Sequence, residues 1–190
     1  MKLKIGFFTI LLALTLILNP SPFTPAAFLA ALFHELGHIL MAKLCHIRLR
    51  ECSIGLFGAG LAPDYGTYSY RQEILLCLAG PLTNLVLGTL ALLLPASDLI
   101  LAFILSSFFL GLLNLLPIQT FDGGRILSHF LSLKLSPSLS HRLLRVLSFL
   151  CVFLMWCFSV YLLLRAAASL SLFVFSLSLF VKLFIEDGEA

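Results

Sequence analysis

Long apolar runs separated by short polar links dominate the pattern of this chain. Six runs approach or exceed the about 20 residues that a helix needs to cross the hydrocarbon core of a bilayer. They are Ile5–Leu18, Pro25–Lys43, Ile74–Leu94, Leu99–Leu116, Leu143–Leu164 and Ala166–Ile185. The first resembles the apolar region of a signal peptide, but Asn19-Pro20-Ser21-Pro22 offers no small-residue cleavage site, so we expect an uncleaved helix. The pattern predicts an all-α polytopic membrane protein with about six transmembrane helices.

One polar link departs from the helical pattern. Residues 47–54 alternate between apolar and polar side chains, as a strand with one apolar side does, and glycines 55, 58 and 60 indicate a turn before Pro63. The alternative is an amphipathic cytosolic loop.

Composition and charge agree with a membrane protein. Hydrophobic residues make up 61 % of the chain, charged residues 11 %, and the mean hydropathy is +1.10. Of the 12 lysines and arginines, all but Arg165 fall on one set of links, so the positive-inside rule predicts that both termini lie in the cytosol. The net charge of +3 reflects this asymmetry, and no basic cluster indicates a nucleic-acid partner. The five cysteines show no paired framework, and we expect no disulfides.

The second apolar run contains His34-Glu35-Leu36-Gly37-His38. On a helix, H-E-x-x-H places two imidazoles about 40° apart on one face, where they can bind zinc. Glu35 lies about 100° around the helix from His34 and can act as general base on a zinc-bound water. Ionisable groups inside a spanning helix mark a functional site by default. The motif therefore predicts a zinc hydrolase within the membrane; the alternative is a set of polar interior residues such as a proton path.

A catalytic zinc site needs a third protein ligand. Asp122 is the strongest candidate, because Pro117 ends the preceding helix and two glycines directly follow the carboxylate. Such a segment can fold back into the membrane only where it is buried in protein or lines a wet cavity. The alternative is an ordinary turn with an aspartate before glycines.

Three motifs, in order, resemble those of the site-2 proteases, which are intramembrane zinc metalloproteases. They are His34-Glu35-Leu36-Gly37-His38, Gly80-Pro81-Leu82-Thr83-Asn84 and Asn114-Leu115-Leu116-Pro117 with Asp122-Gly123-Gly124. The resemblance covers about residues 26–127. It implies that His34, His38 and Asp122 bind one Zn²⁺ per chain and that Glu35 is the catalytic base. It also implies substrate-binding roles for Asn114, Gly80 and Asn84, although Asn84 could instead serve helix packing.

The resemblance extends to organisation and partners. It favours a membrane-associated β-hairpin after the second helix, whose edge would hold an extended substrate by β-augmentation. The six-run, cytosol-facing pattern resembles the sporulation-type branch, whose protease processes a membrane-tethered sigma-factor precursor; a housekeeping bacterial member would look alike. We therefore expect a multi-pass protein of a bacterial cell membrane, with the active site opening toward the cytosol. Residues 1–190 would form one protease domain without a separate soluble regulatory domain, regulated by a membrane partner or by substrate supply.

The sequence departs from many family members at one point. Gln119-Thr120-Phe121 stands where they carry a proline between the Asn-x-x-Pro motif and the aspartate. Two other classes remain open. A prenyl-protease type would need a downstream glutamate ligand on a helix, and only Glu51 and Glu73 precede the tail. A catalytically silent membrane chaperone or metal-binding protein would not need Glu35.

Overall fold

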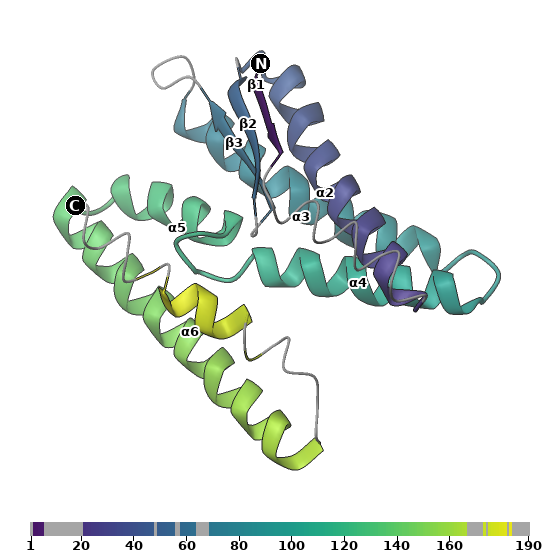
Figure 1. The fold of residues 1–190 in the computed structure, drawn as a ribbon. Helices are drawn as coiled ribbons and strands as arrows, with labels where there is room; N and C mark the ends of the chain where they lie inside the picture. The colour runs from purple at the N-terminus through teal and green to yellow at the C-terminus, as the bar shows by residue number, and fades with distance from the viewer. Residues whose placement is uncertain are drawn as a thin grey trace. The chain divides into compact units, whose positions relative to one another are not determined.

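The computed structural model describes residues 2–5, 21–47, 49–55, 58–63, 69–166, 173, 175–181 and 183. The chain divides into two compact units, residues 1–114 and 115–190. The first unit contains a small sheet and helices α2 (Phe23–Leu44), α3 (Tyr70–Ala91) and α4 (Asp98–Asn114). The second contains α5 (Asp122–Ser132) and α6 (Pro137–Ala166) (Figure 1).

The three helices of the first unit pack against one another in all three pairings. The buried face of α2 is a stripe of small residues with two histidines among them: Ala26, Ala30, His34, Gly37, His38 and Ala42. A methyl group on Gly37 would collide with the Thr83 hydroxyl and lie 2.7 Å from the Ala79 carbonyl oxygen. The backbones of α2 and α3 therefore approach closely, which is how small residues bring helices together in membranes.

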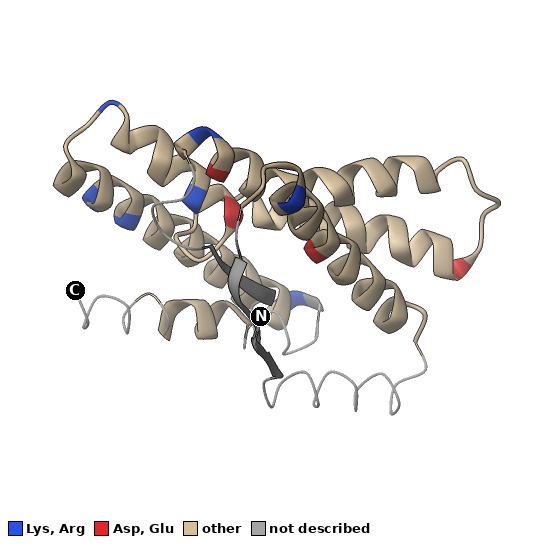
Figure 2. Cartoon of the chain, turned by 90° about the horizontal axis from the view of Figure 1, so that it is seen from above, with Lys and Arg blue, Asp and Glu red and all other residues tan. Residues whose placement is uncertain are grey.

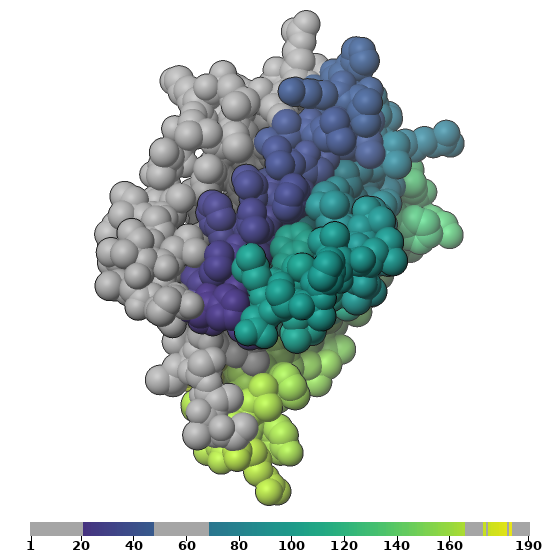
Figure 3. Space-filling view, turned by 90° about the vertical axis from the view of Figure 1, so that its right-hand side faces the viewer, coloured from purple at the N-terminus to yellow at the C-terminus, as the bar shows by residue number. Residues whose placement is uncertain are grey.

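Large apolar side chains lie on the outside of these helices. Leu36 and Leu40 of α2 are exposed, the latter to 61 %, and Val86 and Leu90 of α3 are exposed as well. Figure 2 shows few charged positions along the helices, and Figure 3 shows the surface of α2 directly against that of its teal neighbours. In water such a surface would be costly, whereas lipid tails are as apolar as leucine.

The sheet has three strands: β1 (Lys2–Ile5), β2 (Leu49–Gly55) and β3 (Gly58–Pro63), in the order β1-β2-β3. β1 pairs with β2 in parallel, with Lys2 opposite Glu51, and β2 pairs with β3 antiparallel, with Ile54 opposite Ala59. The register between β2 and β3 shifts between Leu49 and Glu51.

The predicted fold class, all-α with about six spanning helices and a small membrane-associated hairpin, is wrong. Helices α2, α3 and α6 are the ones in the described part of the chain that are long and apolar enough to cross a membrane. α4 has 17 residues, or about 26 Å at 1.5 Å per residue, because Asp98 begins it and the chain leaves the helix before Pro117. The strands form a three-stranded mixed sheet, with a parallel strand from the N-terminus that the apolar pattern did not predict.

Two predicted runs lie largely outside the described residues. Of the first, Ile5–Leu18, only Ile5 is described, and it belongs to β1. Of the last, Ala166–Ile185, residues 175–181 are helical. This segment contacts α6, since the Ser159 and Ser176 hydroxyls lie 3.3 Å apart and the Trp156 and Phe180 rings meet edge to face.

In the second unit, residues 115–121 pack against the first turn of α5. A methyl group on Gly123 would collide with the Leu115 carbonyl and lie 2.6 Å from the Leu116 oxygen. One on Gly124 would collide with the Ile118 carbonyl. The two glycines after Asp122 therefore serve a close backbone approach, and the Phe121 N–H donates to the Ile118 oxygen at 2.8 Å to close the turn.

Ser148 of α6 holds the same segment from outside. This side chain is 0 % exposed. Its hydroxyl accepts the Gln119 N–H at 2.9 Å and donates to the Pro117 carbonyl oxygen at 3.3 Å. The backbone just before Asp122 is thus hydrogen-bonded to α6.

We expect Ser148→Ala to loosen this segment. It removes both hydrogen bonds from a buried site, and each contributes about 0.5–1.5 kcal/mol. The rate of amide exchange in residues 115–121 should increase roughly tenfold. Hydrogen–deuterium exchange mass spectrometry of the protein in nanodiscs measures this rate. Ser159→Ala removes another buried α6 hydroxyl and should leave this segment unchanged. Equal exchange in both variants would show that Ser148 does not restrain the segment.

Candidate metal centre

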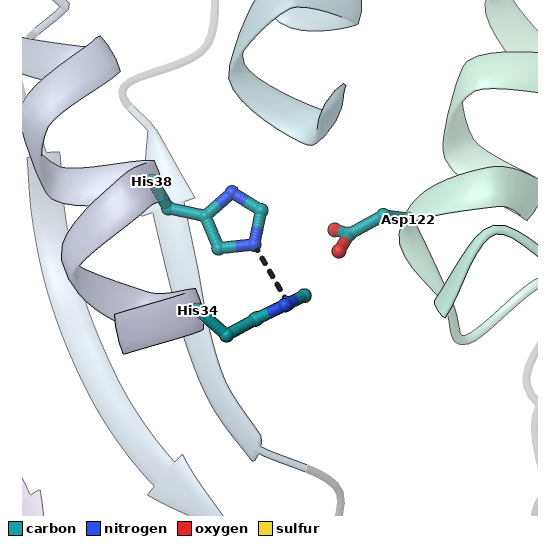
Figure 4. A group of neighbouring side chains, drawn as sticks. All are labelled: His34, His38 and Asp122. Atoms are coloured by element: carbon teal, nitrogen blue, oxygen red, sulfur yellow. Dashed lines mark hydrogen bonds between the residues drawn. The ribbon is translucent and has the colours of Figure 1, made fainter. Parts of the chain in front are cut away.

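Two buried imidazoles of α2 form the core of the site. His34 and His38 lie one helical turn apart and are 5 % and 7 % exposed. Their Nε2 atoms are 3.1 Å apart, and the rings meet edge to face with centroids 4.8 Å apart (Figure 4). The H-E-x-x-H spacing has therefore brought two ring nitrogens together within a stripe that is otherwise made of small residues.

Helix α3 contacts both rings at their Nδ1 atoms. His38 Nδ1 lies 2.7 Å from the Leu76 carbonyl oxygen, and His34 Nδ1 lies 3.3 Å from Asn84 Nδ2. Gly80 lies between these two contacts along α3. A methyl group there would collide with His38 Nε2 and lie 2.8 Å from His34 Cε1. The absence of a side chain at Gly80 provides the space that the two imidazoles occupy.

The chemistry of this donor set fits a metal ion. Metal-binding histidines almost always use their second ring nitrogen in a hydrogen bond that fixes the tautomer and the ring orientation. Here both Nδ1 atoms have such partners on α3, a backbone carbonyl and a side-chain amide, while the two Nε2 atoms face each other. Paired imidazole nitrogens suit zinc and other late first-row metals.

Glu35 and Asp122 are the two carboxylates of the predicted site. Glu35 follows His34 on α2 and is half-buried, about 100° around the helix from the histidine side chain. Asp122 is the first residue of α5 in the second unit and is also half-buried.

The structure brings His34, His38, Gly80 and Asn84 together within the first unit. Asn114 is the last residue of α4, and its side-chain amide donates to the Leu110 carbonyl oxygen of the same helix at 3.0 Å. Sequence reasoning missed the Leu76 carbonyl and Ser148. A backbone acceptor leaves no signal in the sequence, and Ser148 is one serine among many. The sequence did contain a signal for the contact of Gly80 and Asn84 with the histidines. These two residues are four positions apart, as are His34 and His38.

Fold and site together define a helical membrane protein with an H-E-x-x-H centre on a buried helix face. The Peptidase M50B-like family model matches residues 7–184. The chain belongs to this family, which confirms the resemblance to site-2 proteases and identifies an integral membrane protein.

Similarity to individual relatives supports the assignment to this family. The chain is 31 % identical to stage IV sporulation protein FB of Bacillus subtilis (strain 168) over 159 residues, which are 80 % of this chain and 55 % of that protein. It is 29 % identical to a zinc metalloprotease of Methanocaldococcus jannaschii over 115 residues, which are 56 % of this chain and 33 % of the relative. The chain thus spans about half or less of the length of these relatives.

A solved structure has a similar fold. The site-2 protease from Methanocaldococcus jannaschii superposes with a TM-score of 0.63 at 23 % identity, over 94 % of this chain and 85 % of that one. At this identity the similarity concerns the fold alone.

We expect Gly80→Ala to weaken metal binding. The added methyl group would occupy the space of the His38 ring, and overpacking of this kind costs about 1–3 kcal/mol, or roughly tenfold in affinity. Gly88→Ala on the same helix is the matched control, because its nearest contacts, with Phe108 and Ser107, are at 3.4 Å. Metal content after dialysis against a chelator measures both variants. Wild-type metal retention in Gly80→Ala would contradict the role assigned to this glycine.

Proposed function

We propose that this chain is an intramembrane zinc metalloprotease that hydrolyses a peptide bond in or near the transmembrane segment of a membrane-tethered protein. The observation that carries the proposal is the pair of buried imidazoles whose Nδ1 atoms both have hydrogen-bonding partners on α3. Membership of the Peptidase M50B-like family supports it, and the name of the relative from Methanocaldococcus jannaschii is that of a zinc metalloprotease. Both units of the chain would serve one protease domain.

The proposed ligands of one Zn²⁺ are His34, His38 and Asp122. Two imidazoles leave a catalytic zinc one protein ligand short, and carboxylates are common third ligands. Two features of the second unit support Asp122. The segment before it is hydrogen-bonded to Ser148, and the first turn of α5 is packed against that segment's backbone. A carboxylate held by rigid backbone suits a metal ligand, because the geometry of a site depends on supporting interactions.

The chemistry follows from the roles of the side chains. Bound zinc would polarise the peptide carbonyl and acidify the attacking water. Glu35 accepts a proton from that water as its oxygen attacks the carbonyl carbon. The same carboxyl group then gives the proton to the leaving amine as the C–N bond breaks. Water is consumed, and a carboxylic acid and an amine are formed. Asn114 is proposed as a polar contact to the substrate.

The protein would lie in a bacterial cell membrane with both termini and the active-site opening toward the cytosol, as the distribution of basic residues predicts. Its substrate would be a membrane-tethered regulator. A sporulation sigma-factor precursor is one such substrate, supported by the similarity to stage IV sporulation protein FB. A membrane partner would regulate cleavage. The competing function is a catalytically silent membrane chaperone or metal-binding protein.

Two substitutions separate the roles of the carboxylates. Glu35→Gln should retain zinc and lose about 10²- to 10⁴-fold in cleavage, because it removes the base and no ligand. Asp122→Ala should lose both zinc and cleavage. Asp98→Ala, which removes a carboxylate from the first turn of α4, should lose neither. Zinc analysis and cleavage of a co-expressed tethered substrate measure these effects. Normal turnover in Glu35→Gln would favour the silent chaperone, and full zinc in Asp122→Ala would require another third ligand.

The proposed orientation predicts where substrates are cut. Products mapped by mass spectrometry should end near the cytosolic end of the substrate's membrane segment. Glycine or proline near the scissile bond should speed cleavage, because they destabilise a helix by about 1 and 3 kcal/mol respectively. Labelling of Cys45 with a membrane-impermeant thiol reagent should succeed only from the cytosolic side. Labelling from the outside, or cuts at the external end, would reverse the orientation.

A further inference from the structure

The turn between α5 and α6 belongs to a stretch of the chain that is basic throughout. Residues 123–166 contain five lysines and arginines and no acidic residue. Asp122 is the one carboxylate among the described residues of the second unit. It begins α5, whereas the turn follows Ser132, about 15 Å further along the helix axis. Any anion that pairs with the exposed cations of this turn therefore has to come from outside the described helix pair.

Two of these cations are exposed at the turn. Lys134 lies in the turn itself and Arg142 in the second turn of α6, and both side chains are exposed, whereas Arg125 and Arg145 are partly buried. The Lys134 ammonium lies 4.9 Å from the centre of the Phe130 ring, which is itself 50 % exposed. A lysine that rests on exposed apolar surface and keeps its charge at the edge of that surface is typical of a membrane interface.

Serine hydroxyls hold the two helix ends together at this turn. The Ser132 hydroxyl donates to the Ser128 carbonyl oxygen at 2.8 Å and lies 3.4 Å from the hydroxyl of Ser140, a side chain that is 2 % exposed. The Ser140 hydroxyl donates to the same carbonyl oxygen at 3.5 Å. Lys134 follows Ser132 by two residues, and Arg142 follows Ser140 by two. The serine contacts therefore keep both exposed cations at one end of the helix pair.

An exposed apolar stripe continues from Arg142 along α6. The buried side of this part of the helix contains Ser140, Leu144 and Ser148, each 4 % exposed or less. Arg142 lies about 200° around the helix from Ser140, on the exposed side. The apolar side chains exposed beyond it are Val146, Phe149, Leu150, Phe153 and Leu154. From Arg142 to Leu154 the stripe extends about 18 Å, close to half of the about 30 Å hydrocarbon core.

The other end of α6 has a single cation. Arg165 is exposed in the last turn, 23 residues after Arg142, or about 35 Å along the helix axis. The two arginines are thus separated by slightly more than the hydrocarbon core. Among residues 123–165, a second exposed lysine or arginine, Lys134, accompanies only the Arg142 end. The two ends of the helix therefore differ in their attraction for anions.

We propose that the turn between α5 and α6 binds the headgroup of an anionic phospholipid. Lys134 and Arg142 contact the phosphate, and the acyl chains lie along the exposed apolar stripe of α6. Basic side chains next to a membrane surface select anionic lipids, and a zwitterionic headgroup brings a cation of its own. The bound lipid holds the end of α5, the helix whose first residue is Asp122. This inference goes beyond the proposed proteolysis and does not depend on it.

Lipid retention tests the proposal. The protein is reconstituted in nanodiscs with equal parts of phosphatidylglycerol and phosphatidylcholine, and native mass spectrometry counts the lipids of each kind that stay bound after release into detergent. The wild type should retain phosphatidylglycerol preferentially. Lys134→Gln and Arg142→Gln should each lower the ratio of bound phosphatidylglycerol to phosphatidylcholine about fivefold, which corresponds to the attraction of one cation to an anionic membrane surface. Arg142→Lys keeps the charge and should keep the preference.

Arg165→Gln is the matched control, because it removes an exposed cation from the same helix where no second exposed one lies beside it. It should leave the ratio nearly unchanged. Excess inorganic phosphate should not displace the lipid, since it has no acyl chains to cover the apolar stripe. Three results would each overturn the proposal: no preference for phosphatidylglycerol in the wild type, equal losses in Arg165→Gln and Arg142→Gln, or displacement by phosphate, which would indicate a simple anion site.

Amide exchange of the turn provides a second readout. The Leu135 N–H donates to the Leu131 carbonyl oxygen at 2.8 Å within it. Exchange in residues 129–142 should be slower in phosphatidylglycerol nanodiscs than in phosphatidylcholine nanodiscs, and the double variant Lys134→Gln/Arg142→Gln should lose this difference. Equal rates for the wild type in the two lipids would show that no headgroup holds the turn. Neither measurement involves zinc or peptide cleavage, so a failure here leaves the proposed protease function standing, and the reverse also holds.

Discussion

The close approach of α2 and α3 is the constraint on which the centre depends. Gly37 admits Thr83 and the Ala79 carbonyl, and Gly80 admits the two imidazole rings. With the backbones this close, two polar rings can be buried in an apolar helix pair and still find hydrogen-bond partners on the facing helix. Without those partners, each buried nitrogen would carry a desolvation penalty of several kcal/mol. The small residues therefore determine where polar chemistry can exist in this unit.

The second unit solves a similar problem by a different route. An irregular segment must lie next to helices without leaving its backbone groups unpaired. Gly123 and Gly124 let its carbonyls pack onto α5, and Ser148 pairs with both a donor and an acceptor of the segment. A proline would stiffen such a segment by restricting its backbone. Here a hydroxyl on a neighbouring helix restrains it through tertiary contacts.

Much of the centre could be predicted because chemistry and periodicity coincide there. H-E-x-x-H predicts a shared helix face from 3.6 residues per turn alone, and Gly80 with Asn84 repeats the same spacing on the facing helix. In the described part of the chain the span count was too high at α4, because hydropathy measures composition and not where a helix ends; α4 ends at Asn114, although its apolar run continues to Leu116. The parallel strand Lys2–Ile5 was beyond prediction, because pairing with residues 51–54 depends on contacts distant in sequence. The Leu76 carbonyl could not be predicted either, because every residue has one.

The place of Ser148 on α6 ties the segment before Asp122 to one level of that helix. Its 30 residues extend about 45 Å, against a hydrocarbon core of about 30 Å, so in a membrane the helix either tilts or extends into the polar region at its ends. Arg142 and Arg145 lie in the first part of α6 and Arg165 in its last turn, and Ser148 lies three residues, or about 4.5 Å, beyond Arg145. Gln119 is hydrogen-bonded at that level. A segment tied to Ser148 would therefore lie near the level at which the basic residues of α6 reach the polar interface, where water is present.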